Sequence, residues 1–264
     1  MTGELAMATA SVASGGGNYT AEIKPGWDVM GNANGGYLLA MAARAAAHAA
    51  TRPDPVTVTA HFLRPAKPGP VTIENEVLRS GRRFAVVRST VVGDETVVAV
   101  LGTYGTLEPS DYVERLESGP PDIPAPDDCI PILPTTTFPP PFMGRVEVRL
   151  DPADTLFAEG TPSGRPRVQG WFRLRDEEPM DTVALLVAVD AFPPTIFNAN
   201  LPIAWTPTIE LTAHIRARPQ QGWLRCAFTT RFISGGFLEE DGEVWDESGT
   251  LVAQSRQLAL VPRG

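Results

Sequence analysis

The chain has 264 residues and a net charge of −9 at pH 7, from 22 Lys and Arg against 31 Asp and Glu. This acidity excludes a general polyanion binder, so we expect no nucleic-acid partner, although a local basic patch could still hold a small anion. The sequence lacks a long apolar run of about 18 residues or more, which excludes a membrane-spanning helix, and its 26 prolines argue against an all-helical bundle.

Cysteine usage and the first residues bear on the cellular compartment. Cys129 and Cys226 are too few for a disulfide framework and do not have the spacing of a zinc site. Residues 1–18 contain neither Lys nor Arg and no long apolar run, so we interpret them as a flexible tail rather than a secretory signal. We therefore expect a cytoplasmic protein. The sequence also has neither a P-loop nor a dinucleotide fingerprint, and its three isolated histidines make no metal site, so we expect no cofactor and no metal.

Residues 19–107 follow the pattern of one helix and then a meandering antiparallel sheet. Residues 37–50 are rich in Ala and Leu and apolar on nearly every face, which predicts a buried helix. Asn34 can cap this helix, and Gly35 and Gly36 allow another backbone or a ligand to approach its start. Alternating or β-branched runs predict strands at 56–63, 71–78, 84–92 and 96–106.

The next segment, residues 108–142, contains ten prolines in 35 positions, which indicates a stiff linker between two units. After it, residues 143–264 repeat the earlier order. We expect strands at 145–150 and 167–174, then an apolar helix at 182–192 that Pro193 and Pro194 end. Further strands are expected at 208–219, 222–232, 242–248 and 250–261.

Two short matches support a duplication. Thr-Ala-His occurs at 59–61 and again at 212–214, and Leu-Val-Ala at 251–253 lies 154 positions after a similar Val-Val-Ala at 97–99. The sequence therefore predicts an α+β tandem double hotdog, in which each half is an antiparallel sheet wrapped around one long apolar helix.

The order of these motifs resembles the bacterial acyl-CoA thioesterase II family of double-hotdog proteins. In the first half the resemblance rests on Gly35-Gly36 at the helix start, on the Phe-Leu-Arg-Pro of 62–65 and on the Leu-Arg-Ser-Gly of 78–81. In the second half it rests on Asp190, on the Thr-Ile-Glu of 208–210, and on 251–253 followed by Gln257.

This resemblance implies a hydrolase that cleaves an acyl-CoA to a free acid and coenzyme A. It implies that Asp190, Thr208 and Gln257 hold the attacking water. The first half lacks this set, since it carries Thr103 near the position equivalent to Gln257 and Arg44 late in its helix.

The chemistry of a thioester asks for a base that activates water and for donors that stabilise an oxyanion. Asp190 suits the base, because burial and the negative end of its own helix both raise a carboxyl pKa. The alternative is a polar helix-end residue. A hydroxyl at Thr208 and an amide at Gln257 can hold water, although both residue types are also common in ordinary strands.

Two further sets of candidate residues each allow two interpretations. The N–H groups at Asn34, Gly35 and Gly36 could bind substrate by polarising the thioester carbonyl, or the helix start could simply pack closely. Arginines at 79, 82 and 83 could meet coenzyme A phosphates or form a solvated turn. The histidines at 61 and 214 are interpreted as structural.

Two other functions remain open on this fold. One is a non-catalytic acyl-CoA or acyl-carrier binding protein, and the other is a hydratase or dehydratase, for which a placed His–acid pair is missing. We expect acyl-CoA as the substrate, no membrane partner, and a homo-oligomer of double hotdogs, because exposed sheet edges favour further pairing.

Overall fold

A computed structural model describes residues 3–108, 115–136, 138–176 and 178–262. Its first half holds two helices and the strands that follow the order of the sequence. The helices are α1 (Glu4–Ala8) and α2 (Gly35–Ala50). The strands are β1 (Ser11–Gly15), β2 (Asn18–Ile23), β3 (Asp28–Val29), β4 (Asn32–Ala33), β5 (Asp54–Phe62), β6 (Gly69–Ser80), β7 (Ala85–Val92) and β8 (Thr96–Gly105).

The second half has one short α-helix, α3 (Ala184–Ala188), and a second set of strands. These are β9 (Ile130–Pro131), β10 (Val146–Leu150), β11 (Arg167–Leu174), β12 (Thr208–Ile215), β13 (Leu224–Thr229), β14 (Ile233–Ser234), β15 (Phe237–Asp246) and β16 (Leu251–Leu260). Single 3₁₀ turns lie at Pro126–Asp128, Pro141–Gly144, Pro152–Asp154, Leu156–Glu159 and Thr195–Asn198.

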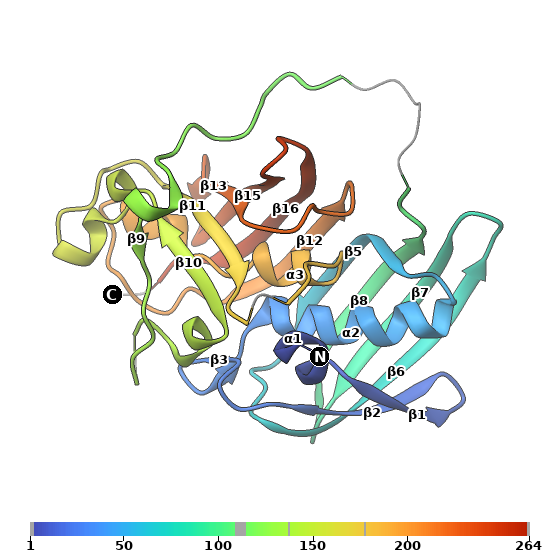
Figure 1. Cartoon of the computed structure of the whole chain (residues 1–264). Coiled ribbons are helices and arrows are strands. Elements are labelled where there is room, and N and C mark those ends of the chain that lie inside the picture. The colour runs from blue at the N-terminus through green and yellow to red at the C-terminus, as the bar shows by residue number, and fades with distance from the viewer. Residues whose placement is uncertain (1–2, 109–114, 137, 177, 263–264) are drawn as a thin grey trace.

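The two halves share one continuous antiparallel sheet, in the order β1-β2-β6-β7-β8-β5-β12-β16-β15-β13-β11-β10-β9 (Figure 1). The strand order outward from the β5–β12 junction is the same on both sides. At that junction Thr59 lies opposite Thr212, the residue 153 positions later, and their hydroxyl oxygens are 2.8 Å apart. The duplicated Thr-Ala-His strands therefore meet at the centre of the sheet, which confirms the double hotdog.

Helix α2 lies against the inner face of the first half-sheet, as its all-apolar sequence predicts (Figure 1). Leu39, Met41 and the alanines between 40 and 46 are fully buried. Asn34 caps the helix, because its side-chain oxygen accepts a 2.9 Å hydrogen bond from the Tyr37 N–H. Across the described residues, the helices lack the combination of length and apolarity that crossing a bilayer requires.

The second helix is shorter than the sequence suggested. Residues 182–192 were expected to be helical, but α3 covers only Ala184–Ala188, and the Asp190 N–H closes a tighter turn onto the Val187 carbonyl at 3.1 Å. Pro193 and Pro194 supply no N–H groups, and a proline also disfavours helical geometry in the residue before it. The chain therefore leaves the helix direction near Asp190.

The expectation of a flexible tail at residues 1–18 is wrong for the part that the structure describes. Helix α1 buries Leu5 and Ala8, and the Ala8 carbonyl accepts a 2.9 Å hydrogen bond from the Tyr37 hydroxyl. Arg44 donates 2.8 Å to the Thr9 hydroxyl, and β1 pairs with β2. This segment therefore covers the outer side of α2, where an all-apolar helix would otherwise face water.

The proline-rich segment does not stay outside the second core along its whole described length. Strand β9 pairs with β10, and Cys129 and Phe142 are buried. Trp171 on β11 donates 2.9 Å to the Pro124 carbonyl. Residues 109–114 lie outside the described part, so the crossing between halves is not described there. Composition suggested that the second half begins at residue 143. Because β9 and the buried Cys129 belong to this half, its structure begins earlier in the sequence.

Candidate active site

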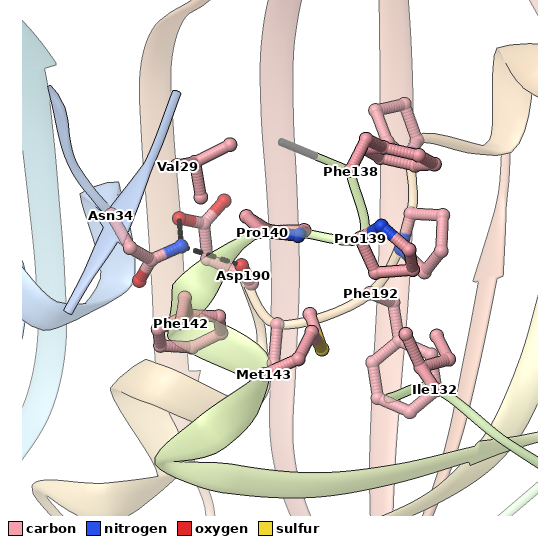
Figure 2. A pocket seen from close by; sticks show the side chains of 13 residues that line it. Val29, Asn34, Ile132, Phe138, Pro139, Pro140, Phe142, Met143, Asp190 and Phe192 are labelled. Atoms are coloured by element: carbon pink, nitrogen blue, oxygen red, sulfur yellow. Dashed lines mark hydrogen bonds between the residues drawn. The ribbon is translucent and has the colours of Figure 1, made fainter. Parts of the chain in front are cut away.

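Asp190 sits where the two halves meet, just beyond α3 and at the N-terminus of α2 (Figure 2). Its Oδ2 atom accepts a 2.7 Å hydrogen bond from the Gly36 N–H and a 3.0 Å bond from Asn34 Nδ2. The same Asn34 nitrogen also donates 3.0 Å to the Asp190 carbonyl. The carboxyl group is therefore fixed in position by residues more than 150 positions away in sequence.

Glycine at positions 35 and 36 is required by this close approach. A Cβ added at Gly36 would lie 2.5 Å from the Leu186 carbonyl oxygen and 2.9 Å from Asp190 Cβ. One added at Gly35 would lie 2.9 Å from the Phe62 ring and 3.0 Å from Asp190 Oδ2. The start of α2 is therefore closely packed, as one of the two interpretations of the sequence predicted. Its packing partner is α3 as well as the sheet.

Burial raises the pKa of Asp190 from its ordinary value of 3.8 to about 6. The hydrogen bond from Gly36 lowers the pKa, the nearby Glu240 carboxylate raises it, and the Asn34 amide lowers it. The N-terminus of α2 therefore lowers the pKa of Asp190, whereas the negative end of α3 raises it. The sequence alone did not reveal the contribution of α2. A carboxyl group with a pKa near 6 is ionised at pH 7 and is a stronger base than a free aspartate.

A cavity of about 80 Å³ opens beside Asp190 (Figure 2). Asp190 and Asn34 are its charged and amide groups, and the rest of its wall is apolar. Much of that wall comes from Ile132 and from residues 138–143, at the end of the proline-rich segment. The lining residues are Val29, Asn34, Ile132, Phe138, Pro139, Pro140, Phe142, Met143, Asp190, Ala191, Phe192, Pro193 and Pro194.

Thr208 and Gln257 are brought together by adjacent strands, β12 and β16. The Thr208 hydroxyl donates a 2.8 Å hydrogen bond to Gln257 Oε1. Within the described residues, neither side chain is hydrogen-bonded to Asp190, and neither lines the cavity. The three predicted residues therefore form a pair and a separate carboxylate, rather than one directly bonded triad.

Glu240 is a residue that sequence reasoning missed. It is only 6% exposed, and Gln257 Nε2 donates 2.6 Å to its Oε1. Its other oxygen, Oε2, accepts 2.8 Å from the Thr195 N–H. In β15 the alternation places Glu240 on the same buried face as Leu238 and Val244, and an acid at such a position was the signal that could have identified it.

The remaining candidates lie elsewhere. Arg79, Arg82 and Arg83 are exposed around the β6–β7 turn, far in sequence from the cavity lining, and Arg83 lies over the Phe84 ring. His61 and His214 are exposed side chains of β5 and β12. No cluster of three or more metal-ligating acids, histidines or cysteines occurs within the described ranges.

Both halves of the chain match models of known protein families. Residues 23–105 match the family description "Acyl-CoA thioesterase N-terminal domain", and residues 126–261 match "Acyl-CoA thioesterase C-terminal domain". Uncharacterised proteins of Mycobacterium bovis and Mycobacterium tuberculosis are each 30% identical, with 92% of this chain and 91% of theirs covered.

Solved structures agree. A candidate thioesterase II from Thermobifida fusca is 32% identical with a TM-score of 0.90, covering 99% of this chain and 98% of its own. A hotdog-fold protein of unknown function from Alicyclobacillus acidocaldarius is 26% identical with a TM-score of 0.87, covering all of both chains. With both halves matched in order, the chain belongs to the acyl-CoA thioesterase family of double-hotdog thioester hydrolases.

Proposed function

We propose that the protein hydrolyses an acyl-CoA and that Asp190 is the general base. The single observation that carries this proposal is a buried carboxyl group, fixed by Asn34 and Gly36 at the edge of an apolar cavity in a chain of this family. Its raised pKa of about 6 agrees with this role. The apolar wall suits an acyl group, and the carboxylate suits a water molecule beside the thioester carbonyl.

The hydrogen bonds from Asn34 Nδ2 and the Gly36 N–H both fall on Oδ2 of Asp190, and a hydrogen bond from the Gly35 backbone also lowers the pKa of the carboxyl group. We assign the reacting oxygen to Oδ1, which lies outside the two bonds on Oδ2. In the proposed reaction Oδ1 takes a proton from water while the water oxygen attacks the thioester carbon. The C–S bond of the resulting tetrahedral intermediate then breaks, and the departing thiolate receives the proton from Asp190. The products are the free acid and coenzyme A.

Asn34 and Gly36 receive a different role from the one that sequence suggested. Their donors are bonded to Asp190, so binding a thioester carbonyl there would require breaking those bonds. We therefore assign them to positioning the base and lowering its pKa relative to full burial alone. Thr208 and Gln257 are proposed to hold the water from the strand side.

Thiol release tests the proposal. Purified protein is incubated with acyl-CoAs of graded chain length, and free coenzyme A is followed with a colorimetric thiol reagent. Turnover that the Asp190→Asn variant lacks would support the assignment. Wild-type protein that binds acyl-CoA without releasing thiol would instead indicate the binding-protein alternative.

A further inference from the structure

Glu240 is a buried acid in the middle of strand β15, and the proposed reaction does not use it. It is 6% exposed and lies opposite Gln257 in the β15–β16 register. An ionised carboxylate that is buried without a cation is costly unless donors surround it. Both oxygens of Glu240 meet donors, the Gln257 amide at 2.6 Å and the Thr195 N–H at 2.8 Å.

These contacts impose a direction on the neighbouring hydrogen bonds. The Gln257 amide turns its NH₂ toward Glu240, whose Oε1 accepts from it at 2.6 Å. Gln257 Oε1 then faces Thr208, and the Thr208 hydroxyl must donate its one proton to that oxygen, as the 2.8 Å bond shows. The lone pairs of Thr208 Oγ remain available to accept a hydrogen bond from a third group.

Resting on the proposed thioester hydrolysis, we infer that Glu240 is a positioning residue that fixes the orientation of the Gln257 amide and so makes the Thr208 oxygen an acceptor for the attacking water. A water that donates one proton toward Thr208 directs its other proton toward the base. The same water then presents an oxygen lone pair for attack on the thioester carbon. Glu240 therefore acts through Gln257 and touches neither water nor substrate.

The Glu240→Gln substitution tests this polarity with little change in shape. A glutamine at this position carries an NH₂ group that must face either the Thr195 N–H or Gln257. If this NH₂ group faces the Thr195 N–H, two donors oppose each other. If it faces Gln257, the Gln257 amide is expected to rotate, which reverses the direction of its hydrogen bond with Thr208. The matched control is Glu243→Gln, on the same strand but on its opposite, partly exposed face.

Measurements of kcat and KM should distinguish a positioning role of Glu240 from a purely structural one. We expect Glu240→Gln to lower kcat about 10-fold to 100-fold, the fold-change equivalent to one hydrogen bond to a charged group, with KM little changed. Gln257→Leu should cost little more in the Glu240→Gln background than Glu240→Gln alone. The Glu243→Gln control should keep wild-type kcat.

The acid limb of the pH profile is a second kinetic readout. The Glu240 charge raises the pKa of Asp190, and Glu239 is the charged group that raises the pKa of Glu240. Removing the Glu240 charge removes a repulsion that raises the pKa of Asp190, so the limb should move to lower pH. This shift reports the Glu240 charge, whereas the fall in kcat and the amide resonance of Gln257 report its positioning role.

A measurement in the free protein makes the inference independent of turnover. The side-chain amide resonance of Gln257, assigned by its loss in Gln257→Leu, should shift in Glu240→Gln and stay in place in Glu243→Gln. If the wild type hydrolyses acyl-CoA but Glu240→Gln matches it in kcat and pH profile, the inference fails while the proposed function stands. If the amide resonance is unchanged in Glu240→Gln, the contact itself is absent and the inference fails whatever the activity.

Discussion

The Gly36 N–H donates a 2.7 Å hydrogen bond to Oδ2 of Asp190, and this bond joins the helix start of one hotdog to the helix end of the other. The two residues are 154 positions apart, close to the spacing of the repeat itself. The base of the proposed reaction is therefore held by the packing of α2 against α3. Stability of that packing and activity should change together.

Substitution of Gly36 by Ala tests this coupling. The added Cβ would lie 2.5 Å from the Leu186 carbonyl oxygen, which belongs to backbone and cannot rotate away. Overpacking of this kind costs about 1–3 kcal/mol, so thermal unfolding should occur several degrees lower, and kcat should fall because Asp190 moves. Gly119→Ala is the control, since its Cβ would meet nothing within 4 Å. Unchanged Tm and kcat in Gly36→Ala would contradict the close contact.

Activity should fall on the acid side of neutrality. The base must be ionised, and burial raises the pKa of Asp190 to about 6, so kcat/KM should rise with pH through about 6 and level off above it. A residue with the ordinary aspartate pKa would instead keep full activity to below pH 5. Initial rates between pH 4 and 8, with protein confirmed as folded at each pH, decide between these outcomes.

Thr208 and Gln257 should contribute less than Asp190, and not additively. Thr208→Val and Gln257→Leu each remove one partner of the 2.8 Å bond between them, so each should lower kcat about 10-fold to 100-fold. Because they hold one water as a unit, the double variant should lose little more than the worse single variant. Losses that multiply fully would show that the two side chains act independently.

The apolar wall of the cavity should influence the choice of acyl chain. Phe138 lines the cavity from the proline-rich segment and is 50% exposed, so its removal should leave the fold intact. Phe138→Ala enlarges a space of about 80 Å³, and kcat/KM for longer acyl chains should increase relative to short ones. Leu133→Ala, exposed and outside the cavity lining, is the matched control. An unchanged chain-length profile would place the acyl group elsewhere.

Local patterns were enough to predict much of the fold. Alanine-rich residues 37–50 formed a buried helix, and most strand runs appeared within a few residues of their expected bounds, although the run expected from residue 242 begins at Phe237. The repeated Thr-Ala-His marked the two strands that meet at the centre of the sheet. These features depend on periodicity and propensity, which neighbouring residues encode.

Features that depend on distant contacts were not predictable in the same way. Residues 3–15 have little local signal for order, yet they are held by Tyr37 and Arg44 of α2. The partner of the Gly36 N–H could not be identified without the α2–α3 packing. Glu240 escaped notice because its strand was expected to begin at residue 242, which hid its place on a buried face.

The rate of thiol release by Asp190→Asn is the most direct test of the central claim. Asparagine keeps the shape of the side chain but can neither carry the charge nor take a proton at the reacting oxygen. General-base catalysis contributes about 10²–10⁴ in rate, so kcat should fall by that amount while KM changes little. Circular dichroism and thermal unfolding establish that the variant is folded. A folded Asp190→Asn protein with wild-type kcat would contradict the account and leave Asp190 as a structural residue.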